Sequence, residues 1–416
     1  MAKALLVGVS QSTFANGEEQ NLFGWQNDTT TEVNTQASAT EDCTFSNLRI
    51  NINSGGSGTN NLRFRDAGAN GNQLATIAGA GIAEDTTNTD SLTAGDLFNL
   101  AYTDTGSNST VSWVTGNISL ASGYGCFHGA ASWSGTIHDV ASATRFLPIN
   151  GNLSGDGLPA EASVGFKARG YDTFEALQVR VIANARTNTS TFRNRINSGD
   201  GTGQIDYAAG ATGLVSDTLL ADSIADGQII NASLTLDTGV EDLTVSFIGA
   251  TLKSTTSKQD CWAQVQDGTA RAASSTATYY AIGGAIALST FTEAQCRIRP
   301  GFAAVVSNLR CYLSTNTYTV NGTLKLYQNG SPVITTTITL LGGAAWYENT
   351  SDTITIDADD ELSFEFDEGT TGDITIHSVG ITFAPVAGGG PALPPFSYGD
   401  LSGIGSSGRF RKDRLN

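Results

Sequence analysis

The chain repeats a short pattern three times at long, regular intervals. An acidic or amide residue followed by threonine occurs at Asp85, Asp217 and Asn349, each 132 residues after the one before. Seven residues further along, the same interval separates Leu92, Ile224 and Ile356. This period is too long for a solenoid repeat and has the length of a whole domain. We therefore expect three copies of one domain, a design that serves geometry more often than catalysis.

The repeat divides the chain into three units and a tail. We expect units at 1–122, 123–256 and 257–386, followed by a Gly/Pro-rich tail with a basic end at 387–416. Each unit is long enough to bury a core of its own. Neither junction between units contains a Pro-rich or charged spacer, so the three units are expected to pack closely.

Composition favours strands and turns over helices. Only 15% of the residues are charged and 39% are hydrophobic, while glycine occurs 48 times. This profile is typical of many short strands joined by turns. The apolar fraction is also too high for a chain that is disordered throughout.

Apolar and polar residues alternate at the same place in each unit, in 48–52, 177–181 and 309–313. This alternation predicts strands with one buried face. The following strands are expected at 62–65, 192–195 and 324–327. Basic residues recur on the outward face of both sets of strands, and this face is expected to be solvated and to need no partner. Strong turn signals at 54–58, 197–201 and 329–330 separate the strands. The fold class predicted is all-β: three tandem antiparallel β-sandwiches, jelly-roll-like, with an extended C-terminal tail.

One segment carries a resemblance to a known family. Leu92-Thr93-Ala94-Gly95-Asp96-Leu97 predicts a strand, a tight turn and a second strand, and 224–229 and 356–361 are its counterparts. The segment resembles the L-x-A-G-D-x-[LV] pattern of tumour-necrosis-factor-like jelly rolls and of many virion jelly rolls. The resemblance covers about ten residues in each unit. It implies a fold that often assembles about a threefold axis, and it implies no reaction.

Charge and hydropathy exclude several partners. The net charge of −18 disfavours nucleic acid, because phosphate requires a positive surface, and is expected to serve solubility. We find no stretch of about 18 apolar residues and no signal-peptide pattern, so no membrane partner is expected. Synthesis in a host cytoplasm is the expectation that follows.

Candidates for catalysis are sparse, and we expect the protein not to be an enzyme. The three histidines, His128, His138 and His377, form no pattern of metal ligands, so no metal and no cofactor are predicted. The acidic run from Asp357 to Glu368 lacks the spacing of a calcium-binding loop and is expected to be a solvated edge. No nucleophile elbow or P-loop occurs in a suitable context.

Cysteines and tryptophans are interpreted as core residues. The five cysteines are expected to be small buried thiols, although a disulfide between Cys296 and Cys311 stays open. Trp262 follows Cys261 as Phe127 follows Cys126, which predicts an equivalent core position in two units. The remaining tryptophans fit a core or an interface better than a sugar-binding platform.

The tail differs from the units in composition. Glycines and prolines dominate 387–395, and four basic residues lie in the last nine positions of an acidic chain. Such a segment cannot form a core of its own. We expect it to be an assembly arm that binds a neighbouring subunit. The residues expected to carry this role are Phe396, Tyr398, Arg409, Phe410, Arg411, Lys412 and Arg414.

Taken as a whole, the chain resembles phage structural proteins rich in Gly, Ser and Thr. The resemblance implies a virion component, such as a capsid decoration, spike or fibre protein, whose partners are copies of itself and other virion proteins. An alternative is a host-surface or carbohydrate-binding protein that uses exposed aromatic residues. A third hypothesis, a polysaccharide depolymerase, requires a cleft with two carboxylates in only one of the three units.

Overall fold

The structure is a computed structural model, and it describes the greater part of the chain. The described residues are 4–8, 13–14, 19–22, 32, 36–54, 58–106, 109–121, 123–153, 160–272, 277–283, 292–339, 342–367 and 372–386. Within them the chain is almost entirely β, as predicted, and its strands form three antiparallel sandwiches. The tail at 387–416, with all seven residues expected to drive assembly, lies outside the described residues.

The first sandwich uses the N-terminal strands. One sheet has the order β1 (Ala4–Gly8), β10 (Ser109–Leu120), β5 (Cys43–Ser54) and β8 (Gly81–Leu92), with β2 (Thr13–Phe14) beside β10. The other has the order β3 (Glu19–Leu22), β9 (Leu97–Asp104), β6 (Thr59–Asp66) and β7 (Ala69–Ala78), with β4 (Ala37–Ser38) beside β9. In β6 the predicted alternation holds, because Leu62 and Phe64 are buried while Arg63 and Arg65 are not.

The second sandwich repeats this plan. Its first sheet contains β18 (Gly213–Ser223), β15 (Thr173–Asn184), β20 (Leu243–Ser254) and β11 (Tyr124–His138), in that order. Its second sheet contains β12 (Thr144–Leu147), β19 (Ile229–Thr235), β16 (Ser190–Ile196) and β17 (Gly199–Tyr207). The short strand β14 (Phe166–Lys167) pairs with β19, and the 3-10 turn η2 (Glu161–Ser163) precedes it.

The third sandwich closes the series. Its first sheet contains β21 (Gln259–Ala272), β28 (Asp373–Pro385), β23 (Ala304–Asn316) and β26 (Ala345–Ile356). Its second sheet contains β22 (Thr278–Tyr280), β27 (Leu362–Asp367), β24 (Gly322–Gln328) and β25 (Ser331–Ile338). The short helix α1 (Glu293–Cys296) stands where the second sandwich has η2.

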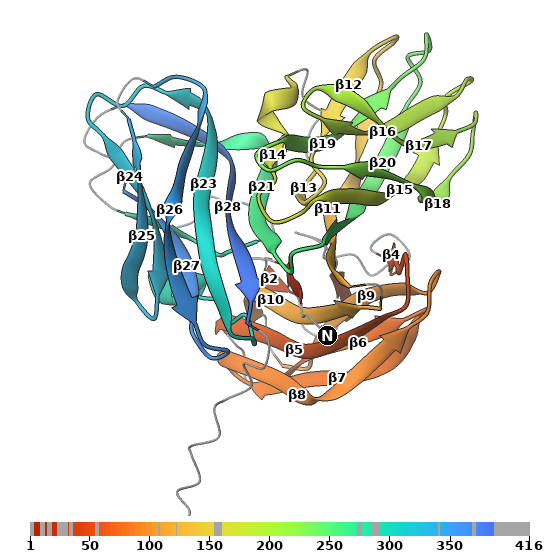
Figure 1. Cartoon of the computed structure of the whole chain (residues 1–416). Helices are drawn as coiled ribbons and strands as arrows, with labels where there is room; N and C mark the ends of the chain where they lie inside the picture. Colours follow the sequence, from red (N-terminus) through yellow and green to blue (C-terminus); the bar gives the residue numbers. More distant parts are fainter. Residues whose placement is uncertain are drawn as a thin grey trace, which may run out of the picture.

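The first sheets of the second and third sandwiches are joined into one sheet of nine strands. The joining strand is β13 (Gly151–Asn152), which runs parallel to β11 on one side and to β21 on the other. The three sandwiches lie around a common centre (Figure 1), with red to orange, yellow-green and teal-blue bodies in chain order. Of the two arrangements that three units allow, a closed body or a rod, the structure has the closed body.

The residues that define the sequence repeat have one structural role in all three units. Each directly precedes three residues of the edge strand that lie opposite a single residue of the next strand, and these single residues are Asn47, Ala176 and Asn308. These three have φ angles of 54°, 46° and 56°, in the left-handed region. The side-chain oxygens of Asp85, Asp217 and Asn349 accept backbone N–H groups inside the bulge. The repeat in the sequence therefore arises because each sandwich contains the same β-bulge, capped by the same residue.

The tight turns also recur, with one difference from the expectation for the first unit. The hairpins β16–β17 and β24–β25 turn at Asn197-Ser198 and Asn329-Gly330, as the turn signals predict, all with positive φ. In the first unit the equivalent hairpin β6–β7 turns at Ala67-Gly68, which is not in the 54–58 signal. That glycine-rich signal lies instead between β5 and β6, and 55–57 are outside the described residues.

Two expectations about chemistry can be compared with the fold. All five cysteines are free thiols with buried side chains, so Cys296 and Cys311 form no disulfide. Burial raises the pKa of the Cys43 thiol to about 12, with nearby Glu41, Asp42 and Asp96 adding to the shift. None of the helices among the described residues is long and apolar enough to cross a membrane.

Candidate functional site: the joints between the sandwiches

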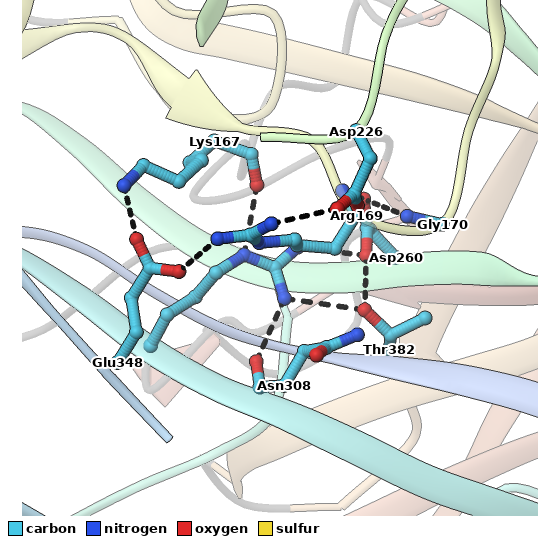
Figure 2. A network of polar contacts seen from close by, with 9 residues as sticks. Lys167, Arg169, Gly170, Asp226, Asp260, Asn308, Glu348 and Thr382 are labelled. Atoms are coloured by element: carbon cyan, nitrogen blue, oxygen red, sulfur yellow. Dashed lines mark hydrogen bonds and ion pairs between the residues drawn. The ribbon is translucent and has the colours of Figure 1, made fainter. Parts of the chain in front are cut away.

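The densest arrangement of charged and aromatic side chains lies where the second and third sandwiches meet. Arg310 on β23 and Asp260 on β21 form an ion pair with 2.7 Å between Nη2 and Oδ1, and neither side chain is exposed to solvent. The other carboxylate oxygen of Asp260 accepts the backbone N–H groups of Arg169 and Gly170, at 2.8 and 2.9 Å. One carboxylate of the third sandwich therefore holds a loop of the second (Figure 2).

Arg310 itself completes the connection. Its Nε donates to the carbonyl oxygen of Lys167 at 2.8 Å, across the joint, and its Nη1 donates to the carbonyl oxygen of Asn308 at 2.8 Å. The guanidinium also lies 4.6 Å from the ring centroid of Phe166. A buried ion pair stabilises a structure only when both partners have further hydrogen bonds, and this pair has them.

A second, more exposed layer of charge covers the buried pair. Glu348 on β26 accepts hydrogen bonds from the side chains of Lys167 and Arg169, the latter at 2.6 Å between Nη2 and Oε2. Arg169 also pairs with Asp226 at 2.8 Å. Burial alone would raise the pKa of Glu348, but the two cations outweigh it and hold that pKa below its ordinary value.

Aromatic rings fill the space beside this network. Trp262 stacks on Phe166 with 4.1 Å between centroids and an angle of 9°, and on His128 with 4.2 Å and 28°. His128 is hydrogen-bonded through Nε2 to the hydroxyl of Tyr171 at 2.9 Å. Burial lowers the pKa of His128 to about 3, so the ring is neutral near pH 7.

The joint between the first and second sandwiches uses the equivalent strand position with different chemistry. Gln178 directly follows Leu177 as Arg310 follows Leu309, and it binds both backbone groups of Ser38 on β4. Its Oε1 accepts the N–H at 3.0 Å, and its Nε2 donates to the carbonyl oxygen at 2.6 Å. β4 and β14 are themselves equivalent, because each pairs with the strand that follows the repeated turn.

The joint between the third and first sandwiches closes the ring. Arg49 follows Leu48 and is only 4% exposed, and a Cβ placed on Gly301 of the third sandwich would clash with its guanidinium. Glu84 pairs with both Arg49 and Arg299, at 3.4 Å in each case. The same strand position therefore contacts a neighbouring sandwich in all three units, and its residues are Arg49, Gln178 and Arg310.

The hydrophobic core continues through these joints. The buried apolar side chains of the first two sandwiches form one continuous group, with Phe98 and Phe127 in contact at 5.6 Å between centroids. Trp113 of the first sandwich is fully buried among residues of the third. Trp113 is thus a core residue, as the sequence indicates, but it belongs to the core of another unit.

The expected equivalence of the two Cys-aromatic pairs is wrong. Trp262 and Phe127 do not fill equivalent positions: Trp262 pairs with Gly380, whereas Phe127 pairs with Thr251, which is two residues out of step. Each ring contacts an adjacent sandwich, which explains why both are buried. The shared Cys-aromatic dipeptide is therefore a coincidence of sequence.

The solvated face expected for the basic residues of both sets of strands is also wrong, because Arg49, Arg180 and Arg310 of the first set are buried and members of the second set form ion pairs. Arg65 pairs with Glu32 at 3.0 Å and Arg195 pairs with Glu161 at 2.8 Å, and each arginine is 13% exposed on its side chain. The glutamates lie 129 residues apart, and Glu293 follows 132 residues later, bound to Arg297. That spacing matches the repeat and is the signal that could have predicted these pairs.

The remaining candidates from the sequence have structural surroundings. Glu361 binds Arg297 and Arg299, and Glu365 binds Lys325 and the hydroxyl of Tyr327, so these members of the acidic run are engaged in contacts. His377 shares a hydrogen bond of 2.8 Å with Ser314, and His138 is fully buried. Over the part of the chain that the structure describes, three or more His, Cys, Asp or Glu side chains nowhere gather as metal ligands would.

Comparisons with known proteins place the chain in no family. No protein-family model matches it, and no curated protein matches it. Among solved structures, an insecticidal delta-endotoxin from Bacillus thuringiensis matches with 9% identity and a TM-score of 0.21, over 91% of this chain and 60% of that one. A xanthan lyase from Paenibacillus matches with 10% identity and a TM-score of 0.18, over 81% of this chain and 51% of that one. Scores this low carry no argument about function.

Proposed function

We propose that this protein is a non-catalytic structural component of a virion, of the capsid decoration, spike or fibre kind. In this proposal the three sandwiches form one rigid block, and the segment 387–416 attaches that block to a second copy or to another virion protein. The observation that carries the proposal is the closed ring of joints through Arg49, Gln178 and Arg310.

Rigidity of the block follows from how the joints are built. At the joint between the second and third sandwiches, Arg310, Asp260, Arg169 and Glu348 all bind groups across or beside the boundary. Buried polar networks in which most groups are hydrogen-bonded make their surroundings rigid. Charged and aromatic groups used in this way fix the shape of the three sandwiches relative to one another. A fixed shape is what a structural building block requires.

The distribution of charge supports attachment through the tail. The chain has 22 basic and 40 acidic residues, yet the last nine positions contain four basic residues and one acidic residue. A basic segment on an acidic body is attracted to the bodies of other copies and is repelled by none of them. Aromatic residues near such charges, here Phe396, Tyr398 and Phe410, are typical anchors of protein interfaces.

The test compares the mass in solution of the full chain with that of a chain ending at Val386. All strands of the described structure end by Pro385, so the shorter chain retains the whole core. We expect a defined oligomer for the full chain and a monomer for the shorter one. A full chain carrying a scrambled order of 387–416 is the matched control, because it keeps length and charge, and it is expected to form no defined oligomer. Equal masses for the full and shortened chains would contradict the proposal.

A further inference from the structure

The second sandwich differs from the other two at one surface position. The three residues that protrude at each capped bulge are polar in the first sandwich, Thr86-Thr87-Asn88, and in the third, Thr350-Ser351-Asp352. In the second sandwich they are Thr218-Leu219-Leu220. Since the bulge has the same geometry in all three units, its fold does not require leucine there.

The two leucines are exposed together with a valine of the same strand. Leu219 is 91% exposed and Leu220 is 44% exposed, and Val215 on the same strand is 40% exposed. Exposed apolar groups gathered on one feature mark interaction sites more often than isolated ones do. The three side chains define what we call the β18 patch.

The place of the β18 patch in the sheet leaves it accessible. β18 is the first strand of the nine-stranded sheet and pairs with β15 on one side, and among the described residues no strand pairs with its other side. The bulge interrupts the pairing with β15, because 218–220 stand opposite Ala176 alone. Leu219 and Leu220 therefore project from the edge of the sheet (Figure 1 shows β18 at its outer margin).

Negative charge around the β18 patch indicates what kind of partner it can bind. Strands β17 and β18 and the loop between them, residues 199–223, contain Asp200, Asp206, Asp217 and Asp222 and no lysine or arginine, and of these four Asp200 already pairs with Arg193 and Arg195 of β16. An identical patch on a second copy would bring these aspartates together, which disfavours association of two patches. A partner that is apolar and basic is favoured, because it would bury the leucines and neutralise the aspartates.

One segment of this chain has that composition. Residues 391–398 contain Leu393, Phe396 and Tyr398, and the basic end begins eleven residues after Tyr398, at Arg409. Thirty residues follow Val386, which at about 3.3 Å per residue can span on the order of 100 Å when extended. This reach is ample for a second copy beside the first.

We propose that the β18 patch is the receptor for residues 391–416 of a second copy of the chain. Leu393, Phe396 and Tyr398 cover Val215, Leu219 and Leu220, and the basic end lies along the aspartates of 199–223. This inference rests on the proposed function, because it names the surface to which the assembly tail binds. It also explains why only one of three equivalent bulges is apolar: each copy has one tail and one receptor.

The test uses a labelled peptide of residues 387–416 and the chain ending at Val386. We expect the peptide to bind in a fluorescence anisotropy titration, with affinity that falls as salt is added. The variant Leu219→Thr/Leu220→Asn, which copies the first sandwich, is expected to bind at least tenfold more weakly. Val240→Thr is the matched control, since Val240 is 66% exposed elsewhere in the same sandwich, and its binding is expected to be unchanged.

Each outcome decides between the inference and the proposed function. Binding of the peptide that is equal in the Leu219→Thr/Leu220→Asn variant, or no binding at all, overturns the inference. If the full chain forms oligomers but its Leu219→Thr/Leu220→Asn variant forms them equally well, the tail has another receptor, and the proposed function still stands. If the chain ending at Val386 forms oligomers through the patch, the occupant is a second body and the tail is excluded.

Discussion

Asp217 accepts the backbone N–H of Gln204 at 2.9 Å and so connects the two sheets of the second sandwich at their open edge. Gln204 belongs to β17 in one sheet, and Asp217 belongs to β18 in the other. The equivalent Asp85 accepts from Leu74 at 2.9 Å, and Asn349 donates from Nδ2 to the carbonyl oxygen of Thr335 at 2.7 Å. The repeated residue therefore caps a bulge and joins two sheets at once, which explains its recurrence.

Replacing this residue should destabilise the sandwich. Asp217→Ala leaves the N–H groups of Gln204 and Leu219 without their side-chain acceptor, which we expect to lower the free energy of unfolding by about 1–3 kcal/mol. Asp217→Asn keeps the Oδ1 acceptor of the Leu219 N–H but replaces the Oδ2 acceptor of the Gln204 N–H with an NH2 donor, so we expect it to lose less than Asp217→Ala but not to match the original chain. Urea denaturation measures both. An equal loss in the two variants would contradict the role as a bulge cap.

Removing one partner of the buried ion pair should have a larger effect. Asp260→Ala leaves the Arg310 guanidinium buried without its counter-charge, and we expect a loss of about 3–5 kcal/mol in the free energy of unfolding. Asp226→Ala removes a partner of Arg169 that is 71% exposed, and this control is expected to lose about 1 kcal/mol or less. Similar losses in the two variants would show that burial of the pair does not matter.

Ala176 is the only one of the three bulge residues that is not asparagine, and its φ of 46° is unfavourable for a Cβ. We expect Ala176→Gly to raise the free energy of unfolding by about 0.5–1 kcal/mol, because relief of this strain exceeds the added freedom of the unfolded chain. Ala183→Gly, at an exposed position of the same strand, should lower it by a similar amount. Thermal unfolding of both variants gives the comparison. A lower free energy of unfolding for Ala176→Gly would show that the backbone at Ala176 is not strained.

The fold could be predicted largely from the sequence, because the repeat indicates the capped bulge and the alternation of apolar and polar residues indicates the buried faces. The joints between the sandwiches could not be predicted from the sequence. Arginine stands at the joint position in the first and third units and glutamine in the second, and an arginine in an alternating strand is also typical of a solvated face, so the residue type does not mark a joint. Gln178 and Arg310 bind backbone groups of a neighbouring sandwich, and a backbone group leaves no trace in the sequence. The exception is Glu32 and Glu161, whose spacing closely matches that of their partners Arg65 and Arg195; Glu293 keeps the same step but binds Arg297.

Stability should fall as the pH decreases from about 6.5, because of His128. Burial depresses the folded-state pKa of His128 to about 3, so between these values the unfolded chain binds a proton that the folded chain does not. We expect His128→Gln to be less stable at pH 7, because it loses the stack on Trp262, but to have a flatter pH dependence between pH 6.5 and 4. Denaturation curves at several pH values give the slope. An unchanged slope in the variant would exclude His128 as its source.

A rigid block requires the three sandwiches to close into a single body, and small-angle X-ray scattering of the chain ending at Val386 measures this directly. A compact body of this length has a radius of gyration of about 21 Å, whereas three sandwiches placed end to end would exceed about 30 Å. We predict a value within a few ångströms of the compact one, and the same value for the Asp226→Ala control. A radius of gyration above about 30 Å, or one that varies with salt, would contradict the closed ring and every proposal built on it.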